Sequence, residues 1–464
     1  MIEAELGVSD KLVHNKQVHE ELLATLGAAV SFAAARLETV RADRSGQVSA
    51  ASPLAIVTAR SIEDVQATMR IATQHRIPVV PRGAGTGLAG GSIGGAGEIV
   101  LSTLAMTEIL EINVDDELAV VQPGILNDDL NAALAPRGLW FAPDPASKAI
   151  STVGGNIATN AGGLLCAKYG VTREAVLGMK IVLADGRLMT LGHRTVKGVT
   201  GYDLTALLIG SEGTLGVIVE ATVKLRALPT GPKATIGAYF TSIEQAARAS
   251  AVITASRLRP AAMELIAQSA LTGIGEFLGL DLGSRGSYLL VQLDGPAAAQ
   301  EADAAVSIIR SLGGDAEITT DDAEGERLFA IRRQFHPAMT AKGTVLIEDV
   351  AVPRSQLPAM FSAISDIEAK YGMVIPTVAH AGDGNLHPNF VFDGPDVPPA
   401  VWDAADEMFL ACLRLGGTLT GEHGVGILKR RWLRDELGDD QVDLQRELKR
   451  VFDPLNLLNP GKIF

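Results

Sequence analysis

The first half of the chain alternates between short apolar runs and segments whose apolar residues recur at helical spacing. Apolar runs of about four to eight residues predict buried strands, whereas apolar residues three and four apart predict amphipathic helices. The expected strands are 53–59, 77–83, 98–102, 118–124 and 217–228, and the expected helices are 18–27, 61–75 and 127–138. Ser61 and Asp64 have the spacing of a capping box at the start of the second helix. Pro136 and Gly138 are expected to end the third.

The second half has a different order of elements, so a domain boundary is expected near residue 228. Its predicted strands are 234–240, 261–266, 287–293 and 315–320, and its predicted helices are 242–256 and 298–313. This β-α-β-β-α-β order is typical of a ferredoxin-like unit. A similar series of strand, helix and two strands runs from 344 to 392. The alternation in the first half predicts an α/β or α+β unit, and the order in the second half predicts an α+β fold with a largely antiparallel sheet.

The composition excludes several classes of protein. Forty basic and 54 acidic residues among 464 give a formal charge of −14, which disfavours nucleic acid as a partner because phosphate contacts need clustered Lys and Arg. Two cysteines, Cys166 and Cys412, are too few for a disulfide framework or a four-thiolate iron–sulfur cluster. No apolar run approaches 18 residues and the N-terminus is polar. We therefore expect a cytoplasmic protein without a transmembrane segment or a signal peptide.

Glycine makes up 49 of the residues and is concentrated in loops. Residues 81–92 read PRGAGTGLAGGS, in which Gly85, Gly87 and Gly90 have the spacing of a dinucleotide-binding fingerprint. That fingerprint needs a helix after the loop, and the following GGSIGGAG is unsuited to propagate one. The segment instead predicts a nest of backbone N–H groups for phosphate oxygens. Two further glycine-rich segments, 143–163 and 210–225, would let backbone approach a flat ligand closely.

Together these segments resemble the FAD-binding domain of the vanillyl-alcohol-oxidase-type flavoproteins. The resemblance rests on PRGAGTGLAGGS, STVGGNIATNAGG and TGYDLTALLIGSEGTLGVIVEATVKL, and it continues through HAGDGNLHPNF, TGEHGVGILK and the terminal NPGKIF. The combination is typical of the FAD-linked D-2-hydroxyacid dehydrogenases, which include D-lactate dehydrogenase, D-2-hydroxyglutarate dehydrogenase and the flavin subunit of glycolate oxidase. It covers about residues 50–464 of this chain.

The resemblance implies a two-part FAD-binding domain followed by an α+β substrate domain of ferredoxin-like units. We expect an N-terminal helical segment at 1–47, the FAD domain at 48–228, the substrate and metal domain at 229–450, and a tail at 451–464 that returns to the FAD domain. FAD should be bound non-covalently, because the first glycine-rich loop contains no histidine for attachment.

The implied cofactor positions fall on the three glycine-rich segments and on the C-terminal tail. They are Pro81, Arg82, Gly83, Ala84, Gly85, Thr86, Gly87, Gly91 and Ser92 for the pyrophosphate, Pro143, Ser147, Thr152, Gly155, Ala158, Thr159 and Asn160 for the flavin ring and ribityl chain, Glu212, Gly216 and Ile218 on the adenine side, and Asn459 near the flavin.

Three of the eight histidines, His380, His387 and His423, lie in two glycine-rich loops, HAGDGNLH and GEHG. Two imidazoles and a carboxylate suit Zn²⁺, Mn²⁺ or Fe²⁺. The resemblance implies that the metal ligands are His380, His387 and Glu422. His423 is then the expected catalytic base, since a neutral imidazole can take the proton of a hydroxyl that the metal has acidified. The open alternative makes His423 the third ligand and removes Glu422 from the metal.

Arg332 and Asn389 match positions that bind the substrate in these relatives, with Arg332 as the counter-charge of the carboxylate. The neighbouring Arg333 is expected to face solvent. The chain departs from the hydroxyglutarate enzymes at His336, where they carry a threonine, and at Ile347, where they carry a lysine. Both changes remove groups that would bind a second carboxylate. The favoured substrate is therefore a small monocarboxylate such as D-lactate or glycolate.

The expected reaction is oxidation of a D-2-hydroxyacid to the 2-oxoacid, with hydride transfer to flavin N5. The alternatives are a D-2-hydroxyglutarate dehydrogenase, a flavin subunit that relays electrons within a glycolate-oxidase-like complex, and a flavoprotein without net oxidation, as in the ether-lipid synthases. A quinone, a cytochrome, an electron-transfer flavoprotein or oxygen would reoxidise the flavin. A homodimer or a partner subunit is expected, and the partner would place the protein at the membrane surface.

Overall fold

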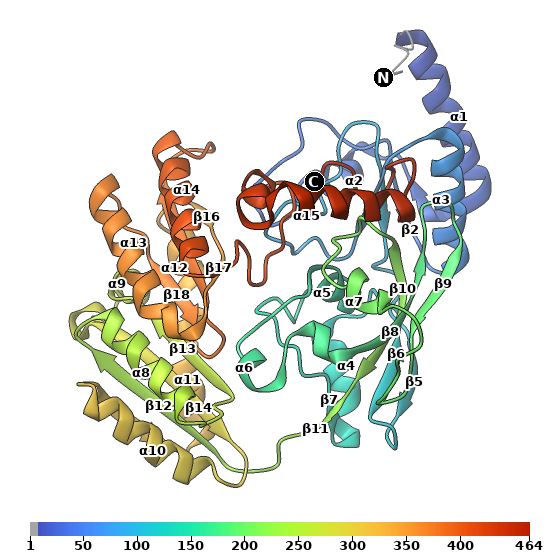
Figure 1. Ribbon diagram of the computed structural model, residues 1–464. Helices are drawn as coiled ribbons and strands as arrows, with labels where there is room; N and C mark the ends of the chain where they lie inside the picture. Colours follow the sequence, from blue (N-terminus) through green and yellow to red (C-terminus); the bar gives the residue numbers. More distant parts are fainter. Residues whose placement is uncertain (1–7) are drawn as a thin grey trace.

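The computed structural model describes the chain from residue 8 to 464, with side chains from Val13 onward (Figure 1). The first half contains a four-stranded sheet of order β1-β2-β4-β3, in which β2, β4 and β3 are parallel. These strands are β1 (Val30–Ser31), β2 (Ala55–Thr58), β3 (Val79–Arg82) and β4 (Ile99–Ser102). Helices α1 (Val8–Leu26) and α3 (Ile62–His75) share a hydrophobic core with this sheet, and the short α2 (Ala34–Glu38) precedes β2.

A second, antiparallel sheet completes the first half, with the order β5-β6-β10-β8-β9. Its strands are β5 (Ile109–Asn113), β6 (Leu118–Val121), β8 (Val176–Val182), β9 (Leu188–Gly192) and β10 (Val217–Lys224). The helices that pack on it are α4 (Asn127–Leu134), α5 (Val153–Thr159) and α7 (Leu204–Leu208). A two-stranded ribbon of β7 (Leu139–Trp140) and β11 (Arg226–Ala227) lies beside it.

The local sequence signals act as predicted. The Ser61 hydroxyl accepts a hydrogen bond from the backbone N–H of Asp64 and so caps α3. Helix α4 continues into a 3₁₀ turn and stops at Gly138, whose φ of 71° is left-handed. As predicted, no helix directly follows the first glycine-rich loop in the described chain. Residues 83–97 form turns, bends and irregular chain. The expectation of a helical segment at 1–47 was wrong for most residues after Leu26, since only the short α2 is α-helical there and β1 and irregular chain make up much of the rest.

The second half is built on one antiparallel sheet of order β15-β12-β14-β13-β18-β19-β16, with β17 also paired to β19. Its strands are β12 (Lys233–Phe240), β13 (Ala262–Ile266), β14 (Ser287–Asp294), β15 (Asp315–Thr319), β16 (Thr344–Ile347), β17 (Val350–Ala351), β18 (Thr377–His380) and β19 (Asn385–Phe392). The first four strands have the order of a ferredoxin-like unit, which confirms the predicted element order. The second unit repeats that order, although its fourth strand is reduced to one bridge between Ala351 and Thr418.

The two faces of this sheet have different neighbours. One face packs against α8 (Ile243–Ala255), α10 (Ala298–Ser311), α13 (Leu357–Tyr371) and α14 (Pro399–Arg414), which together form the largest hydrophobic core. The other face is covered partly by α9 (Gln268–Leu278), α11 (Asp322–Arg333) and α12 (Phe335–Thr340). Because side chains alternate along a strand, the ladder between β13, β18 and β19 places Glu264, His380 and His387 together on this second face.

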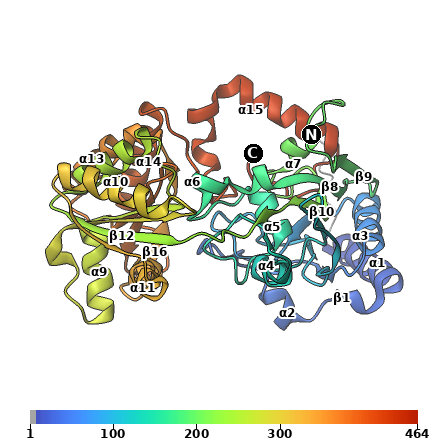
Figure 2. The ribbon, with the colours of Figure 1, turned by 90° about the horizontal axis from the view of Figure 1, so that it is seen from below.

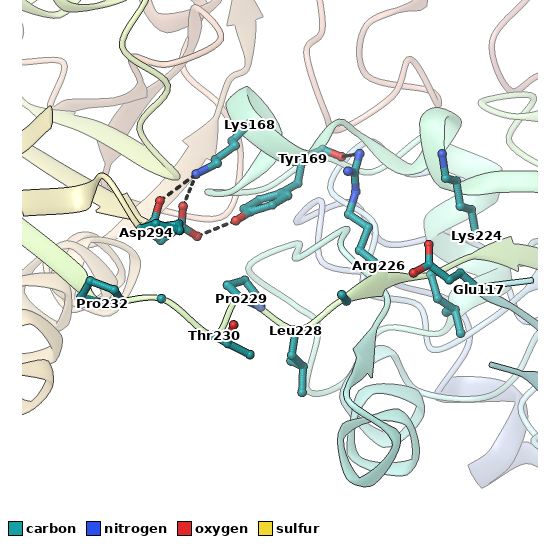
Figure 3. Close-up of a pocket in the computed structure, with 15 residues that line it drawn as sticks. Glu117, Lys168, Tyr169, Lys224, Arg226, Leu228, Pro229, Thr230, Pro232 and Asp294 are labelled. Carbon is teal, nitrogen blue, oxygen red and sulfur yellow. Dashed lines mark hydrogen bonds and ion pairs between the residues drawn. The ribbon is translucent and has the colours of Figure 1, made fainter. Parts of the chain in front are cut away.

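Two helices, α6 (Cys166–Tyr169) and α15 (Leu433–Phe452), and the linker 228–232 connect the two halves. Helix α6 lies between them in both views (Figures 1 and 2). Its Lys168 ammonium and Tyr169 hydroxyl both bind the Asp294 carboxylate, beside the linker 228–232 and a pocket of about 730 Å³ (Figure 3). Helix α15 returns along the first half (Figure 2), where the buried Lys449 donates to the carbonyl of Thr214 at 2.7 Å. The described helices include none long and apolar enough to cross a membrane.

Candidate functional site

The first glycine-rich loop leaves a row of backbone donors without protein partners. Arg82, the last residue of β3, donates to the carbonyls of Ser92 at 2.6 Å and Ala42 at 2.9 Å, so its guanidinium closes the loop from one side. None of the backbone N–H groups from 84 to 92 donates a hydrogen bond to another described residue. Most of these residues are only partly buried, so their N–H groups are accessible to a bound molecule. This loop therefore fits an anionic ligand with several acceptor oxygens, such as a pyrophosphate.

The other predicted cofactor segments meet at this loop. A Cβ on Gly83 would lie 2.5 Å from the hydroxyl of Thr152, which caps α5 by accepting from the backbone of Gly155. The side-chain nitrogen of Asn459 donates to the carbonyls of Gly91 and Glu212, each at 2.7 Å. The amide oxygen of Asn459 is buried and has no partner among the described residues. All three glycine-rich segments and the C-terminal tail thus line one place.

The remaining residues predicted to bind the cofactor lie in different local surroundings. Ala158 and Thr159 lie in α5, which Asn160 ends with a left-handed φ of 51°. The carbonyl of Pro143 accepts from the Asn127 side chain, and Ser147 lies in the turn that follows. Gly216 directly precedes β10. The side chain of Ile218 is buried in the core of the five-stranded sheet, so only its backbone is available to a ligand.

The second candidate centre lies at the ends of β18 and β19. The Nε2 atom of His380 lies 3.4 Å from one Glu422 carboxylate oxygen, and Nε2 of His387 lies 3.9 Å from the other. The two imidazoles are edge to face, with ring centroids 5.0 Å apart. One possible ligand atom from each residue lies within 4.8 Å of the others. The structure thus brings together the three predicted metal ligands.

His380 is held in the orientation that a metal ligand needs. Its Nδ1 lies 2.7 Å from a carboxylate oxygen of the fully buried Glu264, whose other oxygen accepts from Nε of Arg332 at 2.9 Å. A carboxylate on Nδ1 fixes the tautomer and leaves Nε2 free to coordinate, as is usual for ligating histidines. Burial would lower the pKa of His380, but the carboxylates of Glu264 and Glu422 raise it to about 10. A divalent cation would replace this trapped proton.

His423 lies beside the cluster in a different electrostatic setting. Its ring stacks on that of His387, with centroids 5.3 Å apart and planes 16° apart. Burial lowers the pKa of His423 to about 4, and the charges of Lys429 and His380 act in the same direction while Asp349 opposes them. A histidine with this pKa is neutral at pH 7 and can accept a proton. Its Nδ1 is buried and has no partner among the described residues.

Two predicted substrate residues border the cluster. Arg332 uses Nε for Glu264, and its two terminal nitrogens make no hydrogen bond to the described protein. Asn389 donates to the carbonyl of His387 at 3.0 Å, while its buried side-chain oxygen has no partner in the described structure. Arg333, as expected, is half exposed and pairs with Glu326.

One segment, 421–428, connects the two centres. It carries Glu422 and His423, and its next backbone N–H groups, of Val425 and Gly426, donate to the Glu212 carboxylate at 2.7 and 2.9 Å. The N–H of Ile427 donates to the carbonyl of Ala89 in the first glycine-rich loop at 2.9 Å. The segment therefore has the metal-type cluster on one side and the glycine-rich loop on the other.

Sequence reasoning missed the buried carboxylates Glu264 and Asp349 and the buried Lys429. Asp349 accepts from the backbone N–H groups of both Glu422 and His423 at 3.0 Å, and it lies 3.5 Å from the Lys429 ammonium. A signal was present in the sequence, because a charged residue inside an apolar strand is rarely buried unless it is paired. AMELI and VLIEDVAV both contain such residues.

Comparisons with known proteins identify the family of the chain. Residues 53–192 match the family described as FAD binding domain, and residues 231–463 match the family described as FAD linked oxidases, C-terminal domain. Glycolate oxidase subunit GlcD of Bacillus subtilis is 41% identical over 421 residues, which cover 89% of each chain. D-lactate dehydrogenase of Archaeoglobus fulgidus is 36% identical over 420 residues, which cover 89% of this chain and 92% of that one.

Solved structures share the fold at lower identity. A p-cresol methylhydroxylase with bound substrate matches with a TM-score of 0.80 at 17% identity, over 97% of both chains. An alkyldihydroxyacetonephosphate synthase matches with a TM-score of 0.72 at 20% identity, over 96% of this chain and 84% of that chain. This confirms the expected vanillyl-alcohol-oxidase-type architecture. The chain belongs to the FAD-linked oxidase family and is a flavoprotein oxidoreductase.

Proposed function

We propose that this protein oxidises a small D-2-hydroxyacid, with D-lactate or glycolate favoured, to the 2-oxoacid. One observation carries the proposal: the segment 421–428 bears Glu422 and His423 and is hydrogen-bonded to Ala89 and Glu212 at the glycine-rich loop. Acid–base and metal-ligand groups therefore border the proposed flavin-binding loop. The names of the relatives, glycolate oxidase subunit and D-lactate dehydrogenase, support the same substrate class.

Each residue has a defined task in this reaction. His380, His387 and Glu422 would hold one divalent ion, Zn²⁺, Mn²⁺ or Fe²⁺, and Arg332 and Asn389 would bind the substrate carboxylate. When bound, the ion would supply the charge that lowers the pKa of the substrate hydroxyl, and FAD would supply the two-electron acceptor for the C2 hydride. His423 is neutral at pH 7, so its imidazole would take the hydroxyl proton on an unprotonated ring nitrogen.

The preference for a monocarboxylate rests on the residues around Asn389. Ile347 pairs with Asn389 in the ladder between β16 and β19, so its apolar side chain lies on the same face of the sheet as the cluster. An apolar group at this position offers no partner to a second carboxylate. His336, at the start of α12, is the other departure from the hydroxyglutarate enzymes.

The electron acceptor is proposed to be a quinone, a cytochrome or an electron-transfer flavoprotein. Two of the relatives are named as subunits, in Bacillus subtilis and Escherichia coli, which supports a partner subunit for this chain. The two free cysteines, both buried, leave the described chain without an iron–sulfur relay of its own.

Anaerobic flavin reduction tests the proposal directly. D-lactate or glycolate should bleach the yellow, metal-loaded protein faster than D-2-hydroxyglutarate, and L-lactate should not bleach it. Removal of the metal with a chelator should stop the bleaching while FAD stays bound. Equal rates with and without metal would contradict the metal role, and faster reduction by D-2-hydroxyglutarate would favour the dicarboxylate enzyme.

Replacement of the proposed base is expected to slow chemistry without loss of either cofactor. His423→Ala should reduce flavin about 10²–10⁴ times more slowly in stopped-flow traces, the usual range for a missing general base. Partial recovery at high pH is expected, because hydroxide can then take the proton. The exposed His193 provides the control, and His193→Ala should reduce flavin at the wild-type rate. Loss of metal from His423→Ala would instead make His423 a ligand.

A further inference from the structure

Two buried carboxylates flank the two proposed histidine ligands, but only one has a closed hydrogen bond to its imidazole. On one side, Arg332, Glu264 and His380 form a chain of cation, carboxylate and imidazole, with contacts of 2.9 and 2.7 Å. On the other side, Asp349 Oδ1 lies 3.8 Å from Nδ1 of His387. Both of these atoms are buried, and neither has a hydrogen-bond partner within the described protein.

The second oxygen of Asp349 is fully used and fixes the carboxylate in place. Oδ2 accepts from the Thr420 hydroxyl at 2.6 Å and from the backbone N–H groups of Glu422 and His423 at 3.0 Å. The ammonium of Lys429 lies 3.5 Å away and also donates to the Asp349 carbonyl at 2.9 Å. Asp349 therefore has a matched charge, and its remaining acceptor atom among the described contacts is Oδ1, on the side of His387.

We propose that Asp349 is a positioning residue for the metal site: its Oδ1 accepts a hydrogen bond from Nδ1–H of His387 and directs Nε2 of His387 toward the ion. The chain Lys429–Asp349–His387 would then match Arg332–Glu264–His380. The inference rests on the proposed function, because it concerns the same metal. The backbone N–H groups of Glu422 and His423 donate to Oδ2 of Asp349, which also couples the third ligand and the base to this carboxylate.

The alternative is that Asp349 is itself a metal ligand, together with His387 and His423. The hydrogen bonds and charges around Asp349 support this alternative less well. Ligand atoms of these three residues do lie within 4.8 Å of one another. However, one Asp349 oxygen already has three donors, and the Lys429 ammonium next to it would repel a cation. A carboxylate in that state suits an imidazole N–H better than a divalent ion.

The test is a Zn²⁺ titration of the FAD-loaded protein against a fluorescent zinc chelator. Asp349→Asn keeps the shape of the side chain but replaces one acceptor oxygen by an NH₂ donor. The amide therefore cannot accept both from Nδ1–H of His387 and from the backbone N–H groups of residues 422 and 423. Zinc affinity should fall about 10–100-fold, as is usual when the carboxylate behind a ligating histidine is lost. The matched control is Glu348→Gln, since Glu348 is an equally buried neighbour 3.9 Å from Lys429 whose carboxylate makes no hydrogen bond to a described histidine.

Each outcome has a separate meaning. Unchanged affinity in Asp349→Asn, or an equal fall in Glu348→Gln, would overturn the positioning role, and a second strongly bound zinc in the wild type would make Asp349 a ligand. A wild type that binds none of Zn²⁺, Mn²⁺ and Fe²⁺ in the same kind of titration would remove the metal from the proposed function as well.

A measurement on the wild type covers the case in which Asp349→Asn does not fold. Histidine-selective ¹⁵N labelling reports which ring nitrogen carries the proton, and His387→Gln identifies the signal. The zinc-loaded protein should show His387 protonated at Nδ1. An unprotonated Nδ1 would contradict the hydrogen bond to Asp349.

Discussion

Protein that carries Gly85→Val should be purified colourless, without FAD and without activity. Gly85 has a φ of 68°, a conformation that β-branched residues resist. A Cβ at this position would lie 2.1 Å from a terminal nitrogen of Arg82. That guanidinium cannot move freely, because it holds the carbonyls of Ser92 and Ala42. The substitution therefore strains the turn and displaces Arg82, which closes the first glycine-rich loop.

Gly97→Val is the matched control for backbone strain alone. Gly97 has a similar φ of 76°, but nothing lies within 4 Å of a Cβ built there. The control should retain flavin absorbance, and heat or acid should release that flavin because no covalent bond is expected. Full FAD occupancy in Gly85→Val would place the pyrophosphate elsewhere, and flavin on the precipitated chain would disprove non-covalent binding.

His380→Ala should lose the metal and the activity while FAD stays bound. The histidine supplies a proposed ligand, and its removal also leaves the Glu264 carboxylate with Arg332 as its only hydrogen-bond partner among the described residues. His387→Ala should have the same effect, because each removes one of three protein ligands. Metal analysis and the flavin absorbance of the same sample separate the two cofactors. A variant with full metal content would remove that histidine from the ligand set, and the exposed His193→Ala should change neither measurement.

Much of the fold could be predicted because its signals are local. The Ser61 cap, the Pro136–Gly138 stop and the apolar strands each depend on neighbours a few residues away. Elements without such signals were missed, among them α9, β9 and α15. β9 is short and exposes its apolar Leu188 and Met189, so it lacks an alternating apolar and polar pattern, whereas α15 is strongly charged and becomes fixed through contacts such as Lys449 with Thr214.

The candidate site could be predicted only where a motif marked it. His380, His387 and Glu422 lie in glycine-rich loops, so the resemblance identified them, and the structure brings them together. Glu264 comes from a strand 116 residues away from His380, and only the sheet ladder makes them neighbours. No spacing rule carries such information, because sheet register depends on the packing of whole faces.

The pairing of β13 with β18 has a consequence for how this enzyme is assembled. Each strand is the second strand of its own ferredoxin-like unit, so the ladder joins two copies of one topology edge to edge. Glu264 and His380 face each other across that seam, one supplied by each copy. The two units therefore share one backbone topology but contribute different side chains to the site, the carboxylate from one unit and the imidazole from the other. Affinity for the proposed metal would therefore report whether the two copies have docked in register, since neither could orient His380 alone.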